Sequence, residues 1–233
     1  MAQNRITSAE VALRAGVSRS AVSRVFTVGA SASKQTVEKV RLAAEELGYR
    51  PNILARAMVS GHSRMIGLVV AYLDNQFYPE TLEKLSNALQ EKGYHVLVFM
   101  AGKDSQSIDG VIEEILDYQV DGIIAASVAL SSDLATRCRT AGVPMVLFNR
   151  DQDDPLMSSV TSDNIAGGRK VAELFLASGH KRIGYISGWE GASTQRDREA
   201  GFVARLSEAG RVLYARETGD FRMDTAREAA LKM

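Results

Sequence analysis

Residues 7–26 read TSAEVALRAGVSRSAVSRVF and predict two short helices separated by a tight turn. Thr7 and Glu10 have the spacing of a capping box, in which each side chain satisfies a backbone donor at the other's position. Gly16 ends the first helix, and Ser18 caps the second. Two helices joined by so short a turn match the helix-turn-helix motif, whose second helix lies in the major groove of DNA.

A third helix and a short hinge segment follow. Ser33 caps a helix that runs through Leu47. Pro51 blocks its continuation, and residues 52–60 predict a further short helix. Because a helix of about two turns is marginal alone in water, we expect this hinge helix to be ordered only when something packs on it.

The charge is divided unevenly, although the whole chain has a formal net charge of zero. Residues 1–64 contain ten lysines and arginines against four acidic residues, a net charge of +6, and the remainder carries −6. A basic module attracts phosphates through counterion release, and an acidic remainder stays off the duplex. The first quarter of the chain is therefore predicted to bind DNA.

From residue 65 the pattern changes to apolar runs that alternate with amphipathic segments. Continuous apolar runs are typical of parallel strands buried on both faces, and they occur at 65–71, 95–101, 122–126 and 144–148. Helices are predicted between them, at 79–92, 105–118 and 132–141. This alternation predicts a doubly wound α/β lobe with a parallel sheet.

A second unit begins near Asn164. Its predicted elements are a helix at 164–178, a strand at 182–187, a helix at 193–209, a weak strand at 212–215 and a helix from about Met223. We therefore expect four parts: a headpiece at 1–50, a hinge at 51–62, a first lobe at 63–162 and a second lobe at 163–233.

The composition favours a soluble, cytoplasmic protein. No apolar run reaches the length that a membrane-spanning helix needs, and the N-terminus lacks a signal-peptide stretch, so no membrane partner is expected. The single cysteine, Cys138, cannot form an intramolecular disulfide, and the three histidines provide no metal-ligand spacing. We expect neither a metal nor any other cofactor.

Seven segments together carry a family resemblance. They are VALRAGVS at 11–18, AVSRV at 21–25, SKQTVEKV at 33–40, LGYRPN at 47–52, IGLV at 66–69, GHKRI at 179–183 and REAGF at 198–202. In order and spacing the chain resembles the LacI/GalR family of transcription regulators over essentially its whole length. The resemblance implies a homodimer whose two headpieces read a pseudo-palindromic operator. It also implies a core like that of periplasmic sugar-binding proteins, where a small effector, expected to be a sugar or sugar derivative, alters the DNA affinity of a repressor.

The resemblance assigns DNA contacts to positions in the headpiece and the hinge. They are Ser18, Arg19, Ser20, Ser23, Arg24, Ser33, Thr36, Tyr49, Asn52, Ala55 and Met58. An arginine at 19 can pair bidentately with guanine O6 and N7, or it can serve only as a phosphate clamp. Helix capping alone can explain Ser18 and Ser33.

Two positions in the headpiece and the hinge depart from the family pattern. Met58 stands where the family usually has leucine, and it can enter the minor groove as an apolar wedge or pack between two hinge helices. Thr27 stands where the family often has asparagine, which puts a backbone contact there in doubt.

For the effector, the resemblance indicates Asn75, Phe77, Asn149, Asp163, Asn164, Arg198 and Phe221. Open α/β folds bind ligands outside the carboxyl ends of their strands, where these loops are expected. Arg198 can hold two adjacent hydroxyls or a carboxylate, or form a surface ion pair with Glu199 or Asp197. Asn149 replaces an aspartate often found there, and Phe221 can stack on a sugar face or belong to the core.

Two other function classes fit less well. An enzyme is possible because doubly wound sheets host many. However, no GxGxxG follows residues 65–71, neither GxxxxGK[ST] nor GxSxG occurs, and GASASK at 29–34 lacks the second glycine of a phosphate loop. His180 precedes a strand and is interpreted as structural. A plain sugar-binding protein would need a signal peptide and no basic headpiece.

The chain ends within the second lobe, whereas the family pattern returns to the first lobe for its last strands. We therefore expect the second lobe to be incomplete, either in a fragment or in a truncated product. Such a chain is expected to bind operator weakly or only non-specifically, and to show no effector response.

The hinge yields a first testable prediction. The amides of residues 52–60 should exchange rapidly in the free protein and become protected on operator DNA but not on random DNA, because the segment is too short to hold a helix unaided. Hydrogen exchange followed by mass spectrometry measures this. Protection already present without DNA would contradict the prediction.

Overall fold

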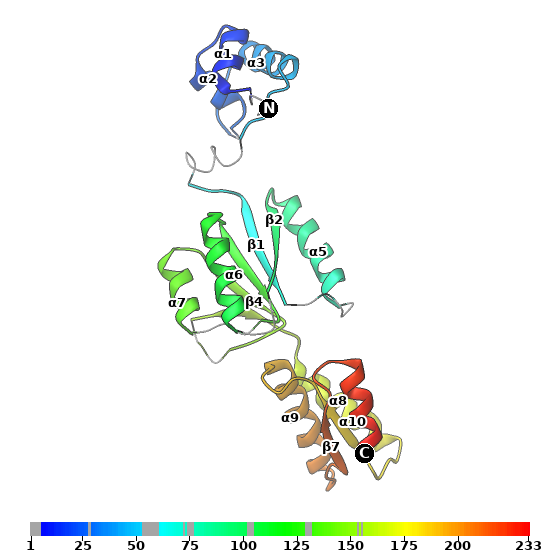
Figure 1. Ribbon diagram of the computed structural model, residues 1–233. Coiled ribbons are helices and arrows are strands. Elements are labelled where there is room, and N and C mark those ends of the chain that lie inside the picture. Colours follow the sequence, from blue (N-terminus) through cyan, green and yellow to red (C-terminus); the bar gives the residue numbers. More distant parts are fainter. Residues whose placement is uncertain are drawn as a thin grey trace. The chain divides into compact units, whose positions relative to one another are not determined.

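The computed structural model divides into two units, residues 1–63 and 64–233, which are described separately (Figure 1). It describes residues 6–27, 29–52, 61–71, 73, 77–101, 105–128, 132–152, 154 and 156–233. The expected hinge helix therefore lies outside the described residues, apart from Asn52 at its start.

The headpiece contains three helices, α1 (Ser8–Ala15), α2 (Arg19–Val25) and α3 (Lys34–Glu46). Each contributes a fully buried valine to a small common core: Val11, Val22 and Val40. The predicted capping box is confirmed, because the Glu10 carboxylate accepts the backbone N–H of Thr7 at 2.7 Å while the Thr7 hydroxyl accepts that of Glu10.

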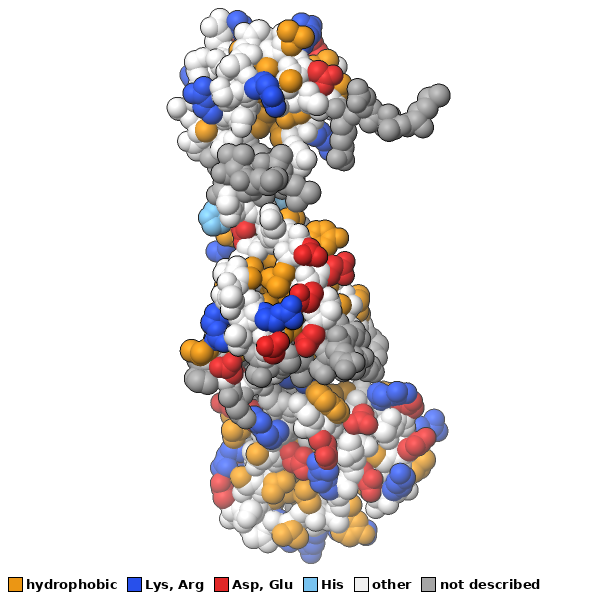
Figure 2. All heavy atoms as spheres, turned by 60° about the vertical axis from the view of Figure 1, so that its left-hand side comes forward, with side chains coloured by type: hydrophobic (Ala, Val, Ile, Leu, Met, Phe, Trp, Pro, Cys, Tyr) orange, Lys and Arg blue, Asp and Glu red, His pale blue; other side chains and the backbone are white. Residues whose placement is uncertain are grey.

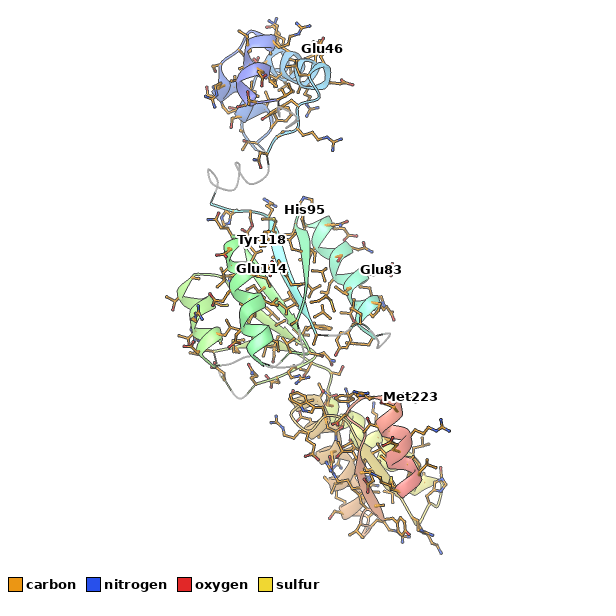
Figure 3. All side chains as sticks on the ribbon, in the orientation of Figure 1. Glu46, Glu83, His95, Glu114, Tyr118 and Met223 are labelled. Carbon is orange, nitrogen blue, oxygen red and sulfur yellow. The ribbon has the colours of Figure 1, made fainter. Side chains whose placement is uncertain are left out.

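Two further features fix the headpiece helices. Gly16 adopts the left-handed conformation, with φ of 65°, that lets α1 end and the chain turn towards α2. Glu46, on α3 (Figure 3), lies 2.6 Å from the Arg14 guanidinium of α1. The turn places α2 beside α1, the ion pair joins α1 to α3, and Val22 packs α2 into their common core, so the helix-turn-helix prediction is confirmed.

The first lobe is a five-stranded parallel sheet with helices on both faces. Its strands are β1 (Met65–Val70), β2 (His95–Met100), β3 (Gly122–Ala126), β4 (Met145–Phe148) and β5 (Ser158–Val160), in the order β2-β1-β3-β4-β5. The helix α5 (Phe77–Glu91) covers one face, and α6 (Ser105–Asp117) and α7 (Ser132–Thr140) cover the other (Figure 1). The predicted doubly wound architecture is confirmed.

Two expectations about the strands of this sheet were wrong or incomplete. The run at 95–101 was predicted to be buried on both faces, but Val98 is 49% and Met100 is 51% exposed because β2 lies at the edge of the sheet. The other edge strand, β5, was not predicted, since its three residues are all exposed and carry no apolar run. One face of β2 is still covered, where Phe99 contacts the ring of Tyr118 just beyond α6 (Figure 3).

The second lobe consists of α8 (Asn164–Ala177), β6 (Gly184–Ser187), α9 (Ser193–Glu208), β7 (Ala215–Thr218) and α10 (Met223–Lys232). The two strands form a separate parallel pair. The weak strand predicted at 212–215 was wrong, because the apolar residues there precede the sheet and Val212 is 84% exposed. The actual strand reads ARET, and its polar residues conceal it from a hydropathy pattern. None of the described helices is both long and apolar enough to cross a membrane.

Two glycines bring α8 and α9 into direct backbone contact. A Cβ atom at Gly168 would overlap the carbonyl oxygen of Arg198 on α9, and a Cβ atom at Gly201 would overlap the carbonyl oxygen of Ile165 on α8. The two contacts are reciprocal, so each helix presents its bare backbone to the other. The crossing therefore tolerates no side chain at either position.

This crossing predicts opposite effects of alanine at two neighbouring glycines. Gly168→Ala should lower the free energy of unfolding by about 1–3 kcal/mol or more, as for overpacking against a rigid backbone. Gly167→Ala, one residue earlier in the same helix, meets no atom within 4 Å. It should be neutral or stabilise by about 0.5–1 kcal/mol through helix propensity. Urea unfolding measures both, and equal effects would contradict the proposed close contact.

Candidate DNA-binding and effector sites

The helix α2 presents a polar face to solvent. Arg19, Ser20, Ser23 and Arg24 are exposed, whereas Val22 is buried against the other headpiece helices. These four positions are spaced so that they share one side of the helix. Ser18 does cap α2, since its Oγ accepts the backbone N–H of Ala21 at 3.2 Å.

A shallow groove joins this face to the start of α3. Arg24, Ser33 and Thr36, three of the predicted DNA-contacting residues, line it together. Ser33 caps α3, and its Oγ lies 2.8 Å from the Thr36 hydroxyl. Thr27, which departs from the family pattern, donates its hydroxyl to the carbonyl of Ser23 at 2.8 Å. Its side chain therefore bonds to the backbone at the end of α2.

The remaining predicted DNA contacts are placed differently. Tyr49 is half-buried and packs its ring on Phe26, with centroids 5.8 Å apart, so the ring belongs to the headpiece core. Asn52 is exposed at the end of the described headpiece. Ala55 and Met58 lie outside the described residues.

The charge of the headpiece is visible on its surface. Among the charged side chains visible on the headpiece in Figure 2, most are basic, whereas acidic side chains gather on the visible face of the first lobe. This agrees with the split in sequence charge between residues 1–64 and the remainder. The polar face of α2 thus belongs to a basic unit, which suits binding to a polyanion.

In the first lobe, a hydrogen-bonded cluster lies at the carboxyl ends of neighbouring strands. The buried hydroxyl of Tyr78, on α5, donates to Oγ of Ser127, which follows β3. The Asn149 amide, which follows β4, donates to both oxygens at 3.2–3.3 Å. In a sheet of order 2-1-3-4-5 the topological switch point, where such folds bind ligands, lies between β1 and β3. Phe77 is nearby in this lobe, half-exposed and stacked on Phe148, and Asn75 lies outside the described residues.

Backbone strain concentrates at these strand ends and at one in the second lobe. Ser127 and Asn149 have φ values of 55° and 56°, and Asp220 and Phe221, which follow β7, have values of 51° and 56°. Non-glycine residues rarely adopt this region, and where they do they often belong to functional sites. The observation favours a ligand site built from the loops after β3, β4 and β7.

In the second lobe, Arg198 reaches across to α8. Its Nε donates to Oδ1 of Asn164 at 2.8 Å, and the buried Asn164 amide donates to the carbonyl of Ser162. Asp163 uses Oδ1 to cap α8 at the backbone N–H of Ala166. Asp163, Asn164 and Arg198 line one groove of about 480 Å³ beside β6.

The alternative ion pair of Arg198 is not what the structure contains. Glu199 instead binds Arg216 of β7 through two hydrogen bonds of 2.5 and 2.9 Å, and Asp197 contacts Arg196. The Arg216 guanidinium lowers the pKa of the Glu199 carboxyl, which burial would otherwise raise. Arg198 is thereby left to point its guanidinium at Asn164.

Phe221 is half-exposed, and its ring lies against Gly188, the residue after β6. A side chain at position 188 would overlap that ring, so the glycine provides the place for it. The ring is therefore fixed at the carboxyl end of the two-stranded sheet without being enclosed in the core.

Comparison with known proteins gives two matches that together span most of the chain. Residues 63–233 match the model of periplasmic binding proteins and the sugar-binding domain of the LacI family, and residues 7–52 match that of bacterial regulatory proteins of the lacI family. The chain belongs to the LacI family.

Relatives of this LacI-family chain include named regulators. It is 34% identical over 207 residues to the maltose regulon regulatory protein MalI of Escherichia coli, covering 88% of this chain and 60% of that protein. It is 32% identical over 201 residues to the sucrose operon repressor of Streptococcus mutans, covering 86% of this chain and 62% of that repressor. The chain thus spans about three fifths of the length of these relatives.

Solved LacI-family structures share its fold. The lac repressor dimer bound to operator and the anti-inducer ONPF matches with a TM-score of 0.87 at 25% identity, covering 99% of this chain and 70% of that chain. A LacI-family regulator from Silicibacter pomeroyi matches with a TM-score of 0.74 at 28% identity, covering 91% of this chain and 64% of that chain.

Sequence reasoning missed several residues of the candidate sites in this LacI-family chain. Tyr78 and Ser127 complete the cluster around Asn149, and Arg216 positions the helix that carries Arg198. A polar residue directly after a buried strand, as at Ser127, was a usable signal in the sequence. Arg216 gave no such signal because its partners are distant in the chain.

The Glu199–Arg216 pair predicts a pH-dependent stability. The pKa of Glu199 is lowered in the folded state, so the ion pair stabilises the fold at pH values above the ordinary pKa of 4.5. This stabilisation is lost as the pH falls through the lowered pKa. Glu199→Gln should cost about 1 kcal/mol at pH 7, a modest value because Arg216 is partly exposed and solvent screens the pair.

The measurement is chemical unfolding of both proteins between pH 7 and pH 3. The difference in the free energy of unfolding between the wild type and Glu199→Gln should shrink below pH 4.5. Glu228→Gln, on the exposed surface of α10, serves as the control and should change stability by less than about 0.5 kcal/mol. A difference that does not vary with pH would exclude the ion pair as its cause.

Proposed function

We propose that this chain is a sequence-specific DNA-binding transcription regulator, acting as a repressor, whose DNA affinity is controlled by a small effector. The observation that carries the proposal is the exposed polar face of α2, with Arg19 and Arg24 on a headpiece of net charge +6. Major-groove recognition requires a helix that is packed on one side and offers donors and acceptors on the other.

Related proteins support the regulatory role and the class of effector. Two relatives bear the names of sugar operon repressors, those for ribose and sucrose, and the matching lac repressor structure contains operator DNA. The regulator CelR, whose structure is a cellobiose complex, matches with a TM-score of 0.65 at 30% identity. We propose a sugar or sugar derivative as the effector of this chain, and double-stranded operator DNA as its partner.

The proposed effector site draws on the strand ends of both lobes. Asn149 with its partners Tyr78 and Ser127 contributes hydroxyl and amide groups, Arg198 with Asn164 contributes a guanidinium, and Phe221 contributes a half-exposed ring. Such a set suits a ligand that has many hydroxyl groups and one apolar face. Asn75, Phe77 and Asp163 remain candidates from the family resemblance.

A homodimer is part of the proposal. The exposed side chains of Val98 and Met100 give the edge strand β2 an apolar face that a second copy can cover. A two-fold symmetric dimer would carry two headpieces, one for each half-site of a pseudo-palindromic operator. We place the regulator in the cytoplasm, with the DNA that it binds, and we propose no catalytic role for it.

Substitution of Arg19 tests base reading. If Arg19 pairs with guanine, Arg19→Ala should cost about 1–3 kcal/mol on a duplex that the wild-type chain selects from a random pool, and much less on an unselected duplex. Arg19→Lys is the matched variant, because it keeps the charge but loses the bidentate fork. Titration of labelled duplexes at fixed salt measures all three proteins.

If Arg19 reads a base, Arg19→Lys should bind the unselected duplex as the wild type does but lose part of the preference for the selected duplex. An equal loss on both duplexes in Arg19→Ala would make Arg19 a phosphate clamp instead.

A further inference from the structure

A buried arginine links the two lobes of the unit formed by residues 64–233. Arg150, after β4, is only 4% exposed, and its Nη2 donates to the carbonyl of Ser127 at 3.0 Å. Its guanidinium carbon lies 5.0 Å from the ring centroid of Trp189, which follows β6 in the second lobe. A desolvated guanidinium over an indole is the most favourable form of cation–π contact.

A second contact runs parallel to the first. The backbone N–H of Asp151 donates to Oγ of Ser193 at 2.8 Å. Ser193 is buried and begins α9, the helix that carries Arg198. Of two consecutive residues of the first lobe, Arg150 therefore contacts the loop after β6 and Asp151 contacts α9, the helix that follows that loop.

The loop that carries Trp189 is itself held firmly. The N–H of Gly188 donates to the Gln195 side chain at 2.8 Å, and Glu190 forms a 2.8 Å ion pair with Arg216 of β7. The Trp189 ring lies against Gly191, where a Cβ atom would overlap it. Trp189 is 44% exposed, and the guanidinium and Gly191 contact the part of its ring that is covered, so this part of the ring makes the contact between the lobes.

We propose that Arg150 and Trp189 form a latch that positions α9, and with it Arg198, relative to the cluster of Tyr78, Ser127 and Asn149. The first-lobe end of the latch is anchored on Ser127, which belongs to that cluster. The part of this inference that concerns effector binding rests on the proposed function. The latch itself does not, and Arg150 is a positioning residue.

The latch can be tested by intrinsic fluorescence, because Trp189 is the only tryptophan of the chain. Arg150→Met removes the cation but keeps an apolar stem in its place. Because Trp189 is already 44% exposed, the change starts from a partly covered ring: its emission should move further to longer wavelength, and its acrylamide quenching constant should rise above the wild-type value. Arg150→Lys should fall between wild type and Arg150→Met, because it retains a cation with weaker stacking.

Matched variants keep the test specific. Arg182, in the second lobe like Trp189, also stacks on an aromatic ring, with its guanidinium carbon 3.8 Å from the ring centroid of Tyr214. Arg182→Met removes this contact and should leave the Trp189 fluorescence unchanged. Ser193→Ala is a milder change that loses only the parallel contact and should also raise quenching, which keeps the proposal testable if Arg150→Met fails to fold. Circular dichroism establishes which variants are folded.

Unchanged emission and quenching in folded Arg150→Met, or in Ser193→Ala if the former does not fold, would overturn the latch. The readout needs neither DNA nor a sugar. A failure of the chain to bind DNA or a sugar would therefore count against the proposed function alone. Unchanged Trp189 fluorescence in the variants would count against the latch alone.

Discussion

The second lobe depends on the contact between α8 and α9 at Gly168 and Gly201. A two-stranded sheet such as β6–β7 is at best marginally stable alone, so its helices must supply most of the packing. Backbone contact across the two glycines lets Ala172 and Phe202 pack closely in the core of this lobe. The same closeness brings Arg198 within hydrogen-bonding distance of Asn164. The candidate effector guanidinium is thus a product of helix packing.

The first lobe and the headpiece reach their sites by other means. In the first lobe, parallel strands end at one edge, so polar residues placed after β3 and β4 meet there, and two of them accept an unfavourable φ to do so. In the headpiece, burial of Val22 against α1 and α3 turns the opposite side of α2 outward. In each case an apolar contact on one side decides which polar groups are presented on the other.

The sequence predicted what local patterns control. Caps at Thr7, Ser18 and Ser33 located the headpiece helices, and apolar runs located β1, β3 and β4, because both signals lie within a few neighbouring residues. The edge strands β5 and β7 were missed or misplaced, since partial exposure removes the apolar run. Burial of β2 was overestimated for a related reason, because hydropathy does not tell an edge strand from a central one.

Side-chain partners were the least predictable part of the candidate sites. Tyr78 and Ser127, like Arg150 and Trp189, are about 40–50 residues apart in the chain and meet only after the sheets have formed. The family resemblance supplied Arg198 and Asn149, and the residues that position them came from the structure. Ala55, Met58 and Asn75 lie outside the described residues and stay predictions.

The headpiece is expected to contact DNA through α2 and the start of α3. The most direct test is to follow the backbone amide resonances of the isotopically labelled 233-residue chain during titration with duplex DNA at low salt. We predict that shift changes concentrate in residues 18–27 and 31–36, while the helices of the second lobe stay unchanged. Changes centred on residues 164–233, or no changes in the headpiece at saturating DNA, would contradict the account.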